Sequence, residues 1–153
     1  MLILGLQKTT LLDYPGKIAS TIFTGGCNFR CPYCHNRDLV MPPSDVQAYS
    51  TDEIFEHLKA KSKVLDGVCI TGGEPTLHKD LPDFIKQIKD MGLLVKLDTN
   101  GTNPDMVNYL IITDYGTVQK AWISSENIEI VDKDLVSVNI SAAKEYISVL
   151  DSP

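Results

Sequence analysis

Apolar and polar positions follow one another in blocks that fit strands leading into helices. KIASTIF (17–23) is apolar and β-branched and ends at two glycines, so it predicts a buried strand. GVCITGGEP (67–75) has the same form, a short apolar run that enters a Gly-Gly turn. LLVKLDTNG (93–101) predicts a third strand. Each of the three segments leads into Gly, Cys or polar residues.

Three helical segments alternate with these strands. TDEIFEHLKAKSK (51–63) begins with Thr51 as its expected cap, carries acidic residues in its first turn and ends in lysines. LPDFIKQIKDMG (81–92) has apolar residues at the spacing of one helix face. NPDMVNYLII (103–112) predicts a third helix with Asn103 as its cap. The apolar face of the second helix consists of Leu81, Phe84, Ile85 and Ile88.

The alternation of strands and helices predicts βαβ units and a parallel sheet or barrel. The loops TGGCNFRCPYCHN, TGGEP and DTNG each come directly after a strand. Because the carboxyl ends of parallel strands share one edge, where active sites form, we expect the three loops to meet in one site.

Composition narrows the class of protein. The chain has 153 residues, 43% hydrophobic and 22% charged, which suits one globular domain with its own core. Its net charge of −6 argues against nucleic acid as a partner. The first residues lack a basic segment and a cleavage site, and no apolar run reaches the roughly 18 residues of a membrane span. We therefore expect a cytoplasmic protein with no membrane partner.

Three of the four cysteines lie in one loop, spaced Cys27-x3-Cys31-x2-Cys34. Thiols stay reduced in the cytoplasm, and thiolates select zinc, Cu(I) or iron–sulfur clusters. Structural zinc needs four ligands, and His35 could supply the fourth only with strain, since it adjoins Cys34. A four-iron cluster fits three cysteines better and leaves one iron open to a small molecule.

The remaining cysteine and two histidines carry weaker signals. Cys69 lies inside the strand GVCIT, where a free cysteine usually packs as a small apolar residue, and this interpretation is favoured over a fourth cluster ligand. His57 and His78 have no partner that the sequence identifies. We expect His57 to be a solvated helix residue and His78 a loop residue.

The cysteine spacing, with Tyr33 before the last cysteine and with GGEP and DTNG after the next two strands, resembles the radical S-adenosylmethionine (SAM) superfamily. GLQKTTLLDYPGKIASTIFTGGCNFRCPYCHN resembles the activating proteins of anaerobic ribonucleoside-triphosphate reductase. The resemblance covers residues 1–112, whereas residues 113–153 diverge from the family pattern. We expect residues 1–153 to form a single domain. It implies an α/β fold, a partial (βα) barrel of parallel strands with outer helices, shortened or divergent at its C-terminus.

The resemblance also implies a chemistry. Cys27, Cys31 and Cys34 would hold a [4Fe–4S] cluster whose open iron chelates the amino and carboxylate groups of SAM. An electron would cleave the sulfonium to methionine and a 5′-deoxyadenosyl radical, which takes hydrogen from a glycine of anaerobic ribonucleotide reductase. Flavodoxin or a ferredoxin is the expected electron donor. No catalytic residue is expected beyond the cluster ligands.

Side-chain chemistry and the same resemblance give candidate contacts to SAM. Tyr33 could lie against adenine or merely pack, and Asn36 is close enough in sequence to the cluster to position SAM. Asp98 could serve ribose hydroxyls or a monovalent cation near the SAM carboxylate, although its loop also suits a plain turn. Gly72 could bring backbone close to the SAM amino group, or simply form a turn. The full set is Tyr33, Asn36, Gly72, Gly73, Glu74, Asp98, Thr99 and Asn100.

One element of the related enzymes is missing. Their strand after DTNG carries an Asp-x-Lys pair that meets a cation and the SAM carboxylate. Counting without a gap reaches AWIS (121–124), and aligning by apolar pattern reaches VNIS (138–141), but neither has the Asp or the Lys. Lys120, Lys133 and Lys144 are the candidate substitutes. The C-terminal segment could be a divergent closure, a degenerate remnant or part of a longer product.

Two other functions stay open. A radical SAM enzyme acting on a small, pterin-like molecule, such as 7-carboxy-7-deazaguanine synthase, shares the TGGEP and TNGT segments. A non-catalytic iron–sulfur protein could keep the cysteine loop and lack SAM cleavage. The phrase LLDYPGK favours the glycyl-radical activating enzyme.

Overall fold

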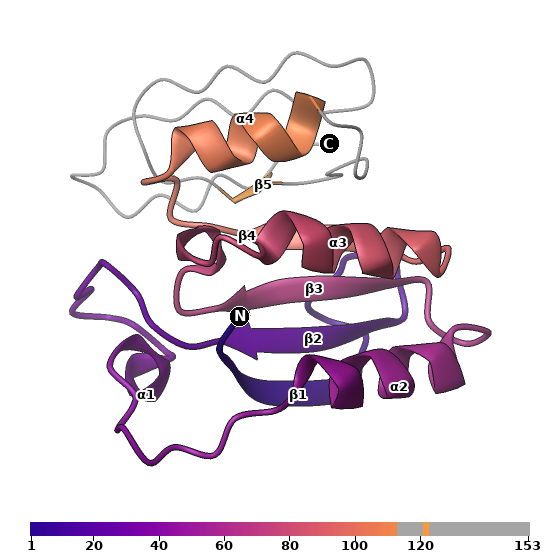
Figure 1. Cartoon of the computed structure of the whole chain (residues 1–153), viewed down its shortest axis with the longest axis horizontal. Coiled ribbons are helices and arrows are strands. Elements are labelled where there is room, and N and C mark those ends of the chain that lie inside the picture. Colours follow the sequence, from indigo (N-terminus) through magenta and orange to yellow (C-terminus); the bar gives the residue numbers. More distant parts are fainter. Residues whose placement is uncertain (113–120, 123–153) are drawn as a thin grey trace.

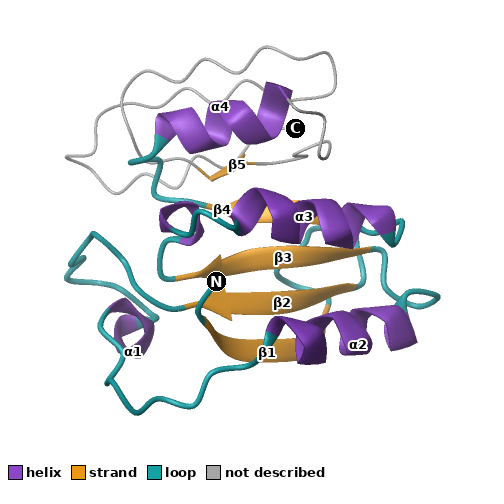
Figure 2. Cartoon of the chain, in the orientation of Figure 1, coloured by secondary structure: helices purple, strands orange, loops and turns teal. Residues whose placement is uncertain are grey.

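The computed structural model describes residues 1–112 and 121–122, which form one sheet with helices beside it (Figures 1 and 2). The strands are β1 (Ile3–Thr10), β2 (Ala19–Thr24), β3 (Gly67–Gly72), β4 (Leu94–Asp98) and β5 (Ala121–Trp122). The helices are α1 (Arg37–Val40), α2 (Thr51–Lys61), the short 3-10 helix η1 (Pro75–Leu77), α3 (Leu81–Asp90) and α4 (Pro104–Ile112).

The sheet has the order β1-β2-β3-β4-β5. β1 is antiparallel to β2, and β2 to β5 are parallel to one another. In Figure 1 the arrowheads of β2 and β3 point to the end of the sheet where α1 and the cysteine loop lie. The predicted parallel α/β architecture, a partial barrel with outer helices, is confirmed.

One face of the sheet is apolar and covered by helices. Ile22, Ile70 and Leu97 stand on this face of neighbouring strands and are at most 2% exposed. They form one buried cluster with apolar residues of α2 and α3, which Figure 1 shows lying along the sheet. The helix residues of this cluster are Ile54, Phe55, Leu58, Leu81, Phe84, Ile85 and Ile88. This is the hydrophobic core that holds the strands in register.

The opposite face is polar. Pairing of β2 with β3 and of β3 with β4 sets Thr21, Cys69 and Lys96 in one row across the sheet. The loop between β1 and β2 folds over this row, since the Thr21 hydroxyl donates to Asp13 Oδ2 at 2.5 Å and the Tyr14 ring lies against Gly67. A sheet buried on one side by apolar residues thus holds hydroxyl, thiol, amine and carboxylate groups on the other.

The predicted segments agree with the structure apart from their ends and one cap. The strands expected in 17–23, 67–75 and 93–101 are present as β2, β3 and β4. The cap of α2 is Ser50 rather than Thr51: the Ser50 side chain accepts from the Glu53 amide while the Glu53 carboxylate accepts from the Ser50 amide. This capping box is the stronger N-terminal arrangement, because it satisfies two amide donors reciprocally.

Three elements were not predicted: β1, α1 and the 3-10 helix η1, which has only three residues. β1 is an edge strand with a mixed exposure pattern and two register shifts against β2, so it lacks the alternation that would identify it from sequence. Helix α1 covers only Arg37–Val40, too short for a periodic pattern.

His57 does have partners, contrary to the sequence-based expectation. Its Nε2 lies 3.2 Å from the Ser20 hydroxyl and 3.3 Å from the Lys8 carbonyl oxygen. The side chain therefore joins α2 to β1 and β2.

β5 pairs in parallel with the end of β4, Leu97 opposite Ala121 and Asp98 opposite Trp122. This pairing agrees with the gap-free alignment that puts AWIS on the strand after DTNG. The alternative VNIS (138–141), the other elements expected in 119–150, and Lys120, Lys133 and Lys144 lie outside the described residues. Within the described part of the chain, no helix is both long and apolar enough to cross a membrane.

Candidate radical SAM site

The three loops that follow β2, β3 and β4 meet at one edge of the sheet, as predicted. The Glu74 amide donates to the Gly26 carbonyl oxygen at 2.8 Å, which joins the second loop to the cysteine loop. From the third loop, the Asn100 side-chain amide lies 2.9 Å from Asn28 Oδ1 and 3.8 Å from Cys27 Sγ. Residues separated by about seventy positions in the chain thus share one site.

Glu74 holds the second and third loops together. Its side chain is fully buried, and its Oε1 accepts from the Thr76 hydroxyl at 2.5 Å and from the Thr99 hydroxyl at 2.7 Å. Its Oε2 accepts from the Asn100 amide at 2.6 Å. A buried carboxylate is stable only when donors surround it, and these contacts meet that requirement.

The two glycines of GGEP allow the second loop to lie against the first. Gly72 has φ +112°, a conformation that side chains other than glycine rarely adopt, and a Cβ there would stand 2.5 Å from the Thr24 amide nitrogen. A Cβ on Gly73 would lie 2.1 Å from the Gly26 carbonyl oxygen. The sequence suggested that these glycines bring backbone close to a ligand. Among the described contacts, they instead lie close to the backbone of Thr24 and of Gly26 in the cysteine loop.

The cysteine loop presents three thiols in partly exposed positions, with no disulfide among them. Cys27 Sγ accepts from the Phe29 amide at 3.3 Å as well as from Asn100. Burial raises the pKa of the Cys27 thiol, the negative charges of Glu74 and Cys31 add to this, and the two N–H donors oppose it. N–H donors on a cysteine sulfur also suit a thiolate that binds an iron–sulfur cluster.

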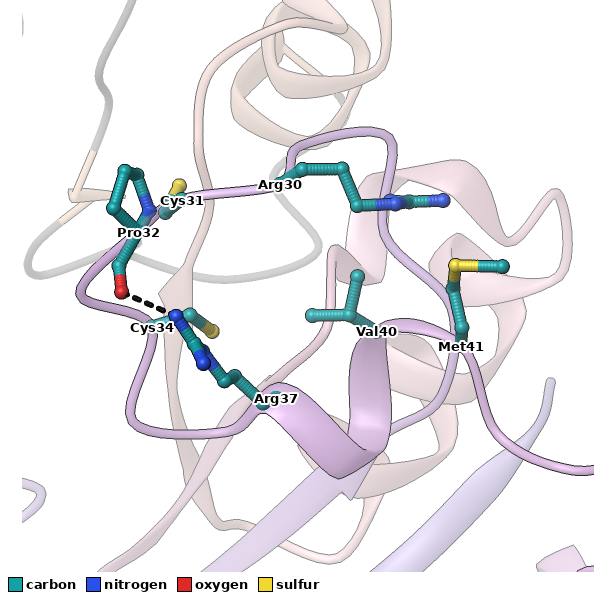
Figure 3. A pocket seen from close by; sticks show the side chains of 7 residues that line it. All are labelled: Arg30, Cys31, Pro32, Cys34, Arg37, Val40 and Met41. Carbon is teal, nitrogen blue, oxygen red and sulfur yellow. Dashed lines mark hydrogen bonds between the residues drawn. The ribbon is translucent and has the colours of Figure 1, made fainter.

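Two of the thiols line a cavity of about 290 Å³ (Figure 3). Its lining consists of Arg30, Cys31, Pro32, Cys34, Arg37, Val40 and Met41. Arg30 donates to the carbonyl oxygens of Cys27 and Phe29 at 2.7 and 2.8 Å. Arg37 donates to the Pro32 carbonyl oxygen at 2.6 Å. The arginines therefore brace the loop, and both line the same cavity as Cys31 and Cys34.

These residues fit an iron–sulfur cluster. Among residues 1–112 and 121–122, no three His, Cys, Asp or Glu side chains converge on a point where one metal ion would sit. The cysteines of a four-iron cluster bind different irons, so convergence on one point is not required of them. Soft, unpaired thiols, N–H donors to sulfur and two guanidinium groups are the donor set and the charge that such a cluster needs.

A second cavity, of about 440 Å³, lies over the polar face of the sheet. Asn36 from the end of the cysteine loop forms part of its wall, which connects the cavity to the cysteine loop. Leu12, from the loop between β1 and β2, also lines it. The complete lining is Leu12, Asp13, Pro15, Phe23, Asn36, Thr71, Lys96 and Asp98.

Lys96 is a residue of this cavity that the sequence analysis missed. Its side chain is 6% exposed, and its Nζ lies 2.6 Å from Asp98 Oδ1 and 3.6 Å from Cys69 Sγ. Burial, then the charge of Asp98, raises the pKa of the Cys69 thiol strongly, so this thiol stays neutral. Cys69 is buried as expected, although it contacts an ion pair rather than an apolar neighbour. The sequence did contain a signal for this residue, namely a lysine inside an otherwise apolar predicted strand.

The remaining residues that the sequence singled out differ in their surroundings. Tyr33 is 85% exposed, so packing within the fold does not explain it. Asn36 precedes α1, and its carbonyl oxygen accepts from the Leu39 amide. His78 is not without a partner, since its Nε2 lies 3.1 Å from the Gly25 carbonyl oxygen. Burial lowers the pKa of His78, and the Gly25 carbonyl opposes this.

Comparison with known proteins identifies the family of the chain. The family profile of the Radical SAM superfamily matches residues 21–124. A protein of Methanocaldococcus jannaschii, provisionally named a glycyl-radical enzyme activating enzyme, is 38% identical over 111 residues, which are 72% of this chain and 45% of that protein. A 7-carboxy-7-deazaguanine synthase of Halobacterium salinarum is 33% identical over 95 residues, 60% of this chain and 36% of that enzyme.

Among solved structures, QueE from Escherichia coli matches with a TM-score of 0.53 and 18% identity, over 82% of this chain and 58% of that chain. This likeness concerns the fold. The chain spans less than half the length of the two relatives named above. Proteins of the matched superfamily use a [4Fe–4S] cluster and SAM. With its three cysteines and the converging loops in place, the chain belongs to the radical SAM superfamily.

Proposed function

We propose that the protein is a glycyl-radical activating enzyme whose target is anaerobic ribonucleoside-triphosphate reductase. The observation that carries this proposal is the similarity to the M. jannaschii relative, which extends over 72% of the chain. The cavity over the polar face adds support. Leu11 and Leu12, from the LLDYPGK segment, are 69% and 87% exposed, and Leu12 lines the cavity. Adjacent exposed leucines at a cavity suit a polypeptide substrate.

In this proposal Cys27, Cys31 and Cys34 hold the cluster. When bound, the cluster and SAM supply an electron and a carbon-centred radical, chemistry that amino-acid side chains lack. Arg30 and Arg37 keep the loop carbonyls satisfied and offset the negative charge of the thiolates. The protein's share of the reaction is therefore binding, orientation and exclusion of water.

The loops after β3 and β4 would bind SAM beside the cysteine loop. Asn100 stands next to Cys27 and is fixed by Glu74, so we assign Glu74 a positioning role through Thr99 and Asn100. Asn36 and Asp98 line the same cavity and are proposed direct contacts, together with the backbone of Gly72 and Gly73. Tyr33, with its ring in solvent, is available to cover an adenine. A monovalent cation beside Asp98 is a further candidate ligand.

The partners follow from the same proposal. The glycyl radical enzyme would present a glycine at the cavity over the polar face. A flavodoxin or a ferredoxin would deliver the electron in the cytoplasm.

A second candidate is a radical SAM enzyme that acts on a small, pterin-like molecule. It is favoured by the similarity to the H. salinarum relative, which is named a 7-carboxy-7-deazaguanine synthase. The volume of about 440 Å³ would admit a molecule of that size. A protein that binds the cluster without cleaving SAM is the third alternative.

One experiment separates the three. The full chain, reconstituted with iron and sulfide without oxygen and chemically reduced, is mixed with SAM and the anaerobic ribonucleotide reductase of the same organism. A glycyl radical seen by electron paramagnetic resonance, absent with Cys31→Ala, is the expected result. 5′-Deoxyadenosine without a radical on the reductase contradicts the proposed target, and the pterin-like substrate is then tested by its consumption. A formed cluster without 5′-deoxyadenosine supports the non-catalytic alternative.

A further inference from the structure

Lys96 is an unusual residue for its place in the fold. β4 lies between β3 and β5 in the parallel part of the sheet, where strands are ordinarily apolar on both faces. Its neighbours Val95 and Leu97 follow that rule and are at most 3% exposed. Lys96 breaks it on the polar face, and residues that break a local rule inside a well-packed element are expected at functional sites.

Fold stability does not explain the lysine. Lys96 and Asp98 form an ion pair whose lysine side chain is 6% exposed. Taking such a pair out of water costs about as much as the attraction returns, and well-packed apolar residues of similar size often stabilise a fold equally well or better. The third group of the cluster is the buried Cys69 thiol, whose Sγ lies 3.6 Å from Lys96 Nζ. The pair is therefore better explained by what enters the cavity.

The cavity has an uneven arrangement of charge. Asp13 and Asp98 contribute carboxylates to its lining, whereas Lys96 is the one cation among the described residues that line it. The carboxylate of Asp13 is held by the Thr21 hydroxyl and that of Asp98 by Lys96. A ligand with both positive and negative groups fits such a cavity, with its anionic group directed to Lys96.

The cofactor of the superfamily has these groups, since SAM carries a sulfonium, an ammonium and a carboxylate. We propose that Lys96, held in place by Asp98, binds the carboxylate of SAM in the cavity that extends from Asn36 over the polar face. This assignment rests on the cofactor and does not depend on which molecule receives the radical. It gives the chain a cationic SAM contact on β4 itself.

The test measures binding of two ligands to the holoenzyme. The dissociation constants of SAM and of decarboxylated SAM, which lacks the carboxylate, are determined for the reconstituted wild-type protein and for Lys96→Met. We expect Lys96→Met to weaken SAM binding by about 10-fold to 100-fold, the range for removing a hydrogen bond to a charged group. Binding of decarboxylated SAM is expected to change by less than about 3-fold, because this ligand has no carboxylate for Lys96 to contact.

Two further variants distinguish a loss of ligand binding from misfolding of the protein. Lys96→Met with Asp98→Asn replaces the ion pair by neutral groups of similar size, so no lone carboxylate stays buried. Lys96→Arg keeps the charge and should restore much of the preference for SAM. Lys86→Met on α3, where Lys86 pairs with Asp90 at the surface, is the matched control and should bind both ligands as the wild type does.

The result that supports the proposal is a loss confined to SAM in Lys96→Met and, in the double variant, a larger loss for SAM than for decarboxylated SAM. Equal weakening of SAM and of decarboxylated SAM would assign Lys96 to the fold and overturn the proposal. Unchanged SAM binding in the neutral double variant would overturn it as well. Iron content and circular dichroism of each variant show whether cluster and fold are retained, independently of SAM cleavage.

Discussion

The two faces of the sheet, built from the same strands, serve different purposes. On one face Ile70 is fully buried among helix residues, while its neighbour Thr71 lines the cavity on the other face. The alternation along β3 therefore separates residues that hold the fold together from residues that meet a ligand. The comparison teaches that polar residues at central strand positions mark the functional face before any ligand is known.

The largest effect on activity is expected from a change in the cysteine loop, which lies at the edge of the sheet between the two faces. Cys31→Ala removes one of the three proposed cluster ligands, and the loop has no spare thiol, so iron binding and formation of 5′-deoxyadenosine should fall to background. Iron analysis, the visible spectrum and chromatography measure this. Cys69→Ala, which alters the polar face but not the loop, should leave the iron content nearly unchanged. Normal iron content and SAM cleavage in Cys31→Ala would contradict the cluster assignment.

Neighbouring residues on opposite faces provide the next test. Ile70→Ala leaves a cavity in the core and should lower the free energy of unfolding by about 2–5 kcal/mol. Thr71→Ala, one position away, should change it by less than about 1 kcal/mol, because its side chain lies at the cavity. Denaturant unfolding of the two variants measures the difference. Equal losses would show that the faces do not differ in the way described.

A smaller effect is expected at Glu74, which ties the loops together. Glu74→Gln keeps the shape but loses a buried carboxylate that accepts from Thr76, Thr99 and Asn100. The free energy of unfolding should fall by about 1.5–3 kcal/mol. Glu56→Gln, exposed on α2, is the control and should stay within about 0.5 kcal/mol of the wild type. A Glu74→Gln protein as stable as this control would remove Glu74 from the network.

The smallest effect is a dependence on alkaline pH. Burial raises the pKa of Tyr14 from 10.0 to about 12. The folded state favours the neutral phenol, so this contribution to stability is complete below pH 10 and disappears as the pH rises toward about 12. Urea unfolding of wild type and Tyr14→Phe across this range isolates it: the wild type should lose stability more steeply. If the free energies of unfolding of the two proteins changed equally with pH, Tyr14 would not be buried against the polar face.

Much of the site follows from the sequence because its parts are local. Cysteine spacing identified the loop, and the position of GGEP and DTNG after strands predicted that the loops converge. The contacts of Glu74 and Asn100 confirm this convergence. The three main helices were visible through caps and periodicity.

The features that could not be predicted from the sequence depend on contacts between residues far apart in the chain. The pairing of β1 with β2 and the partners of His57 and His78 cannot be read from any single segment. Glu74 was expected to touch the cofactor, but its buried contacts are with Thr76, Thr99 and Asn100. Lys96 was overlooked although Asp98, two positions along the same strand, shares its face; its contact with Cys69 comes only from the register between β3 and β4.

The central claim is that the cysteine loop and the polar face form one SAM-cleaving site. Its most direct test is the formation of 5′-deoxyadenosine by the protein after reconstitution without oxygen and chemical reduction, compared with a reaction that lacks the protein. The account predicts product above that control. A well-formed cluster that yields no 5′-deoxyadenosine would contradict it.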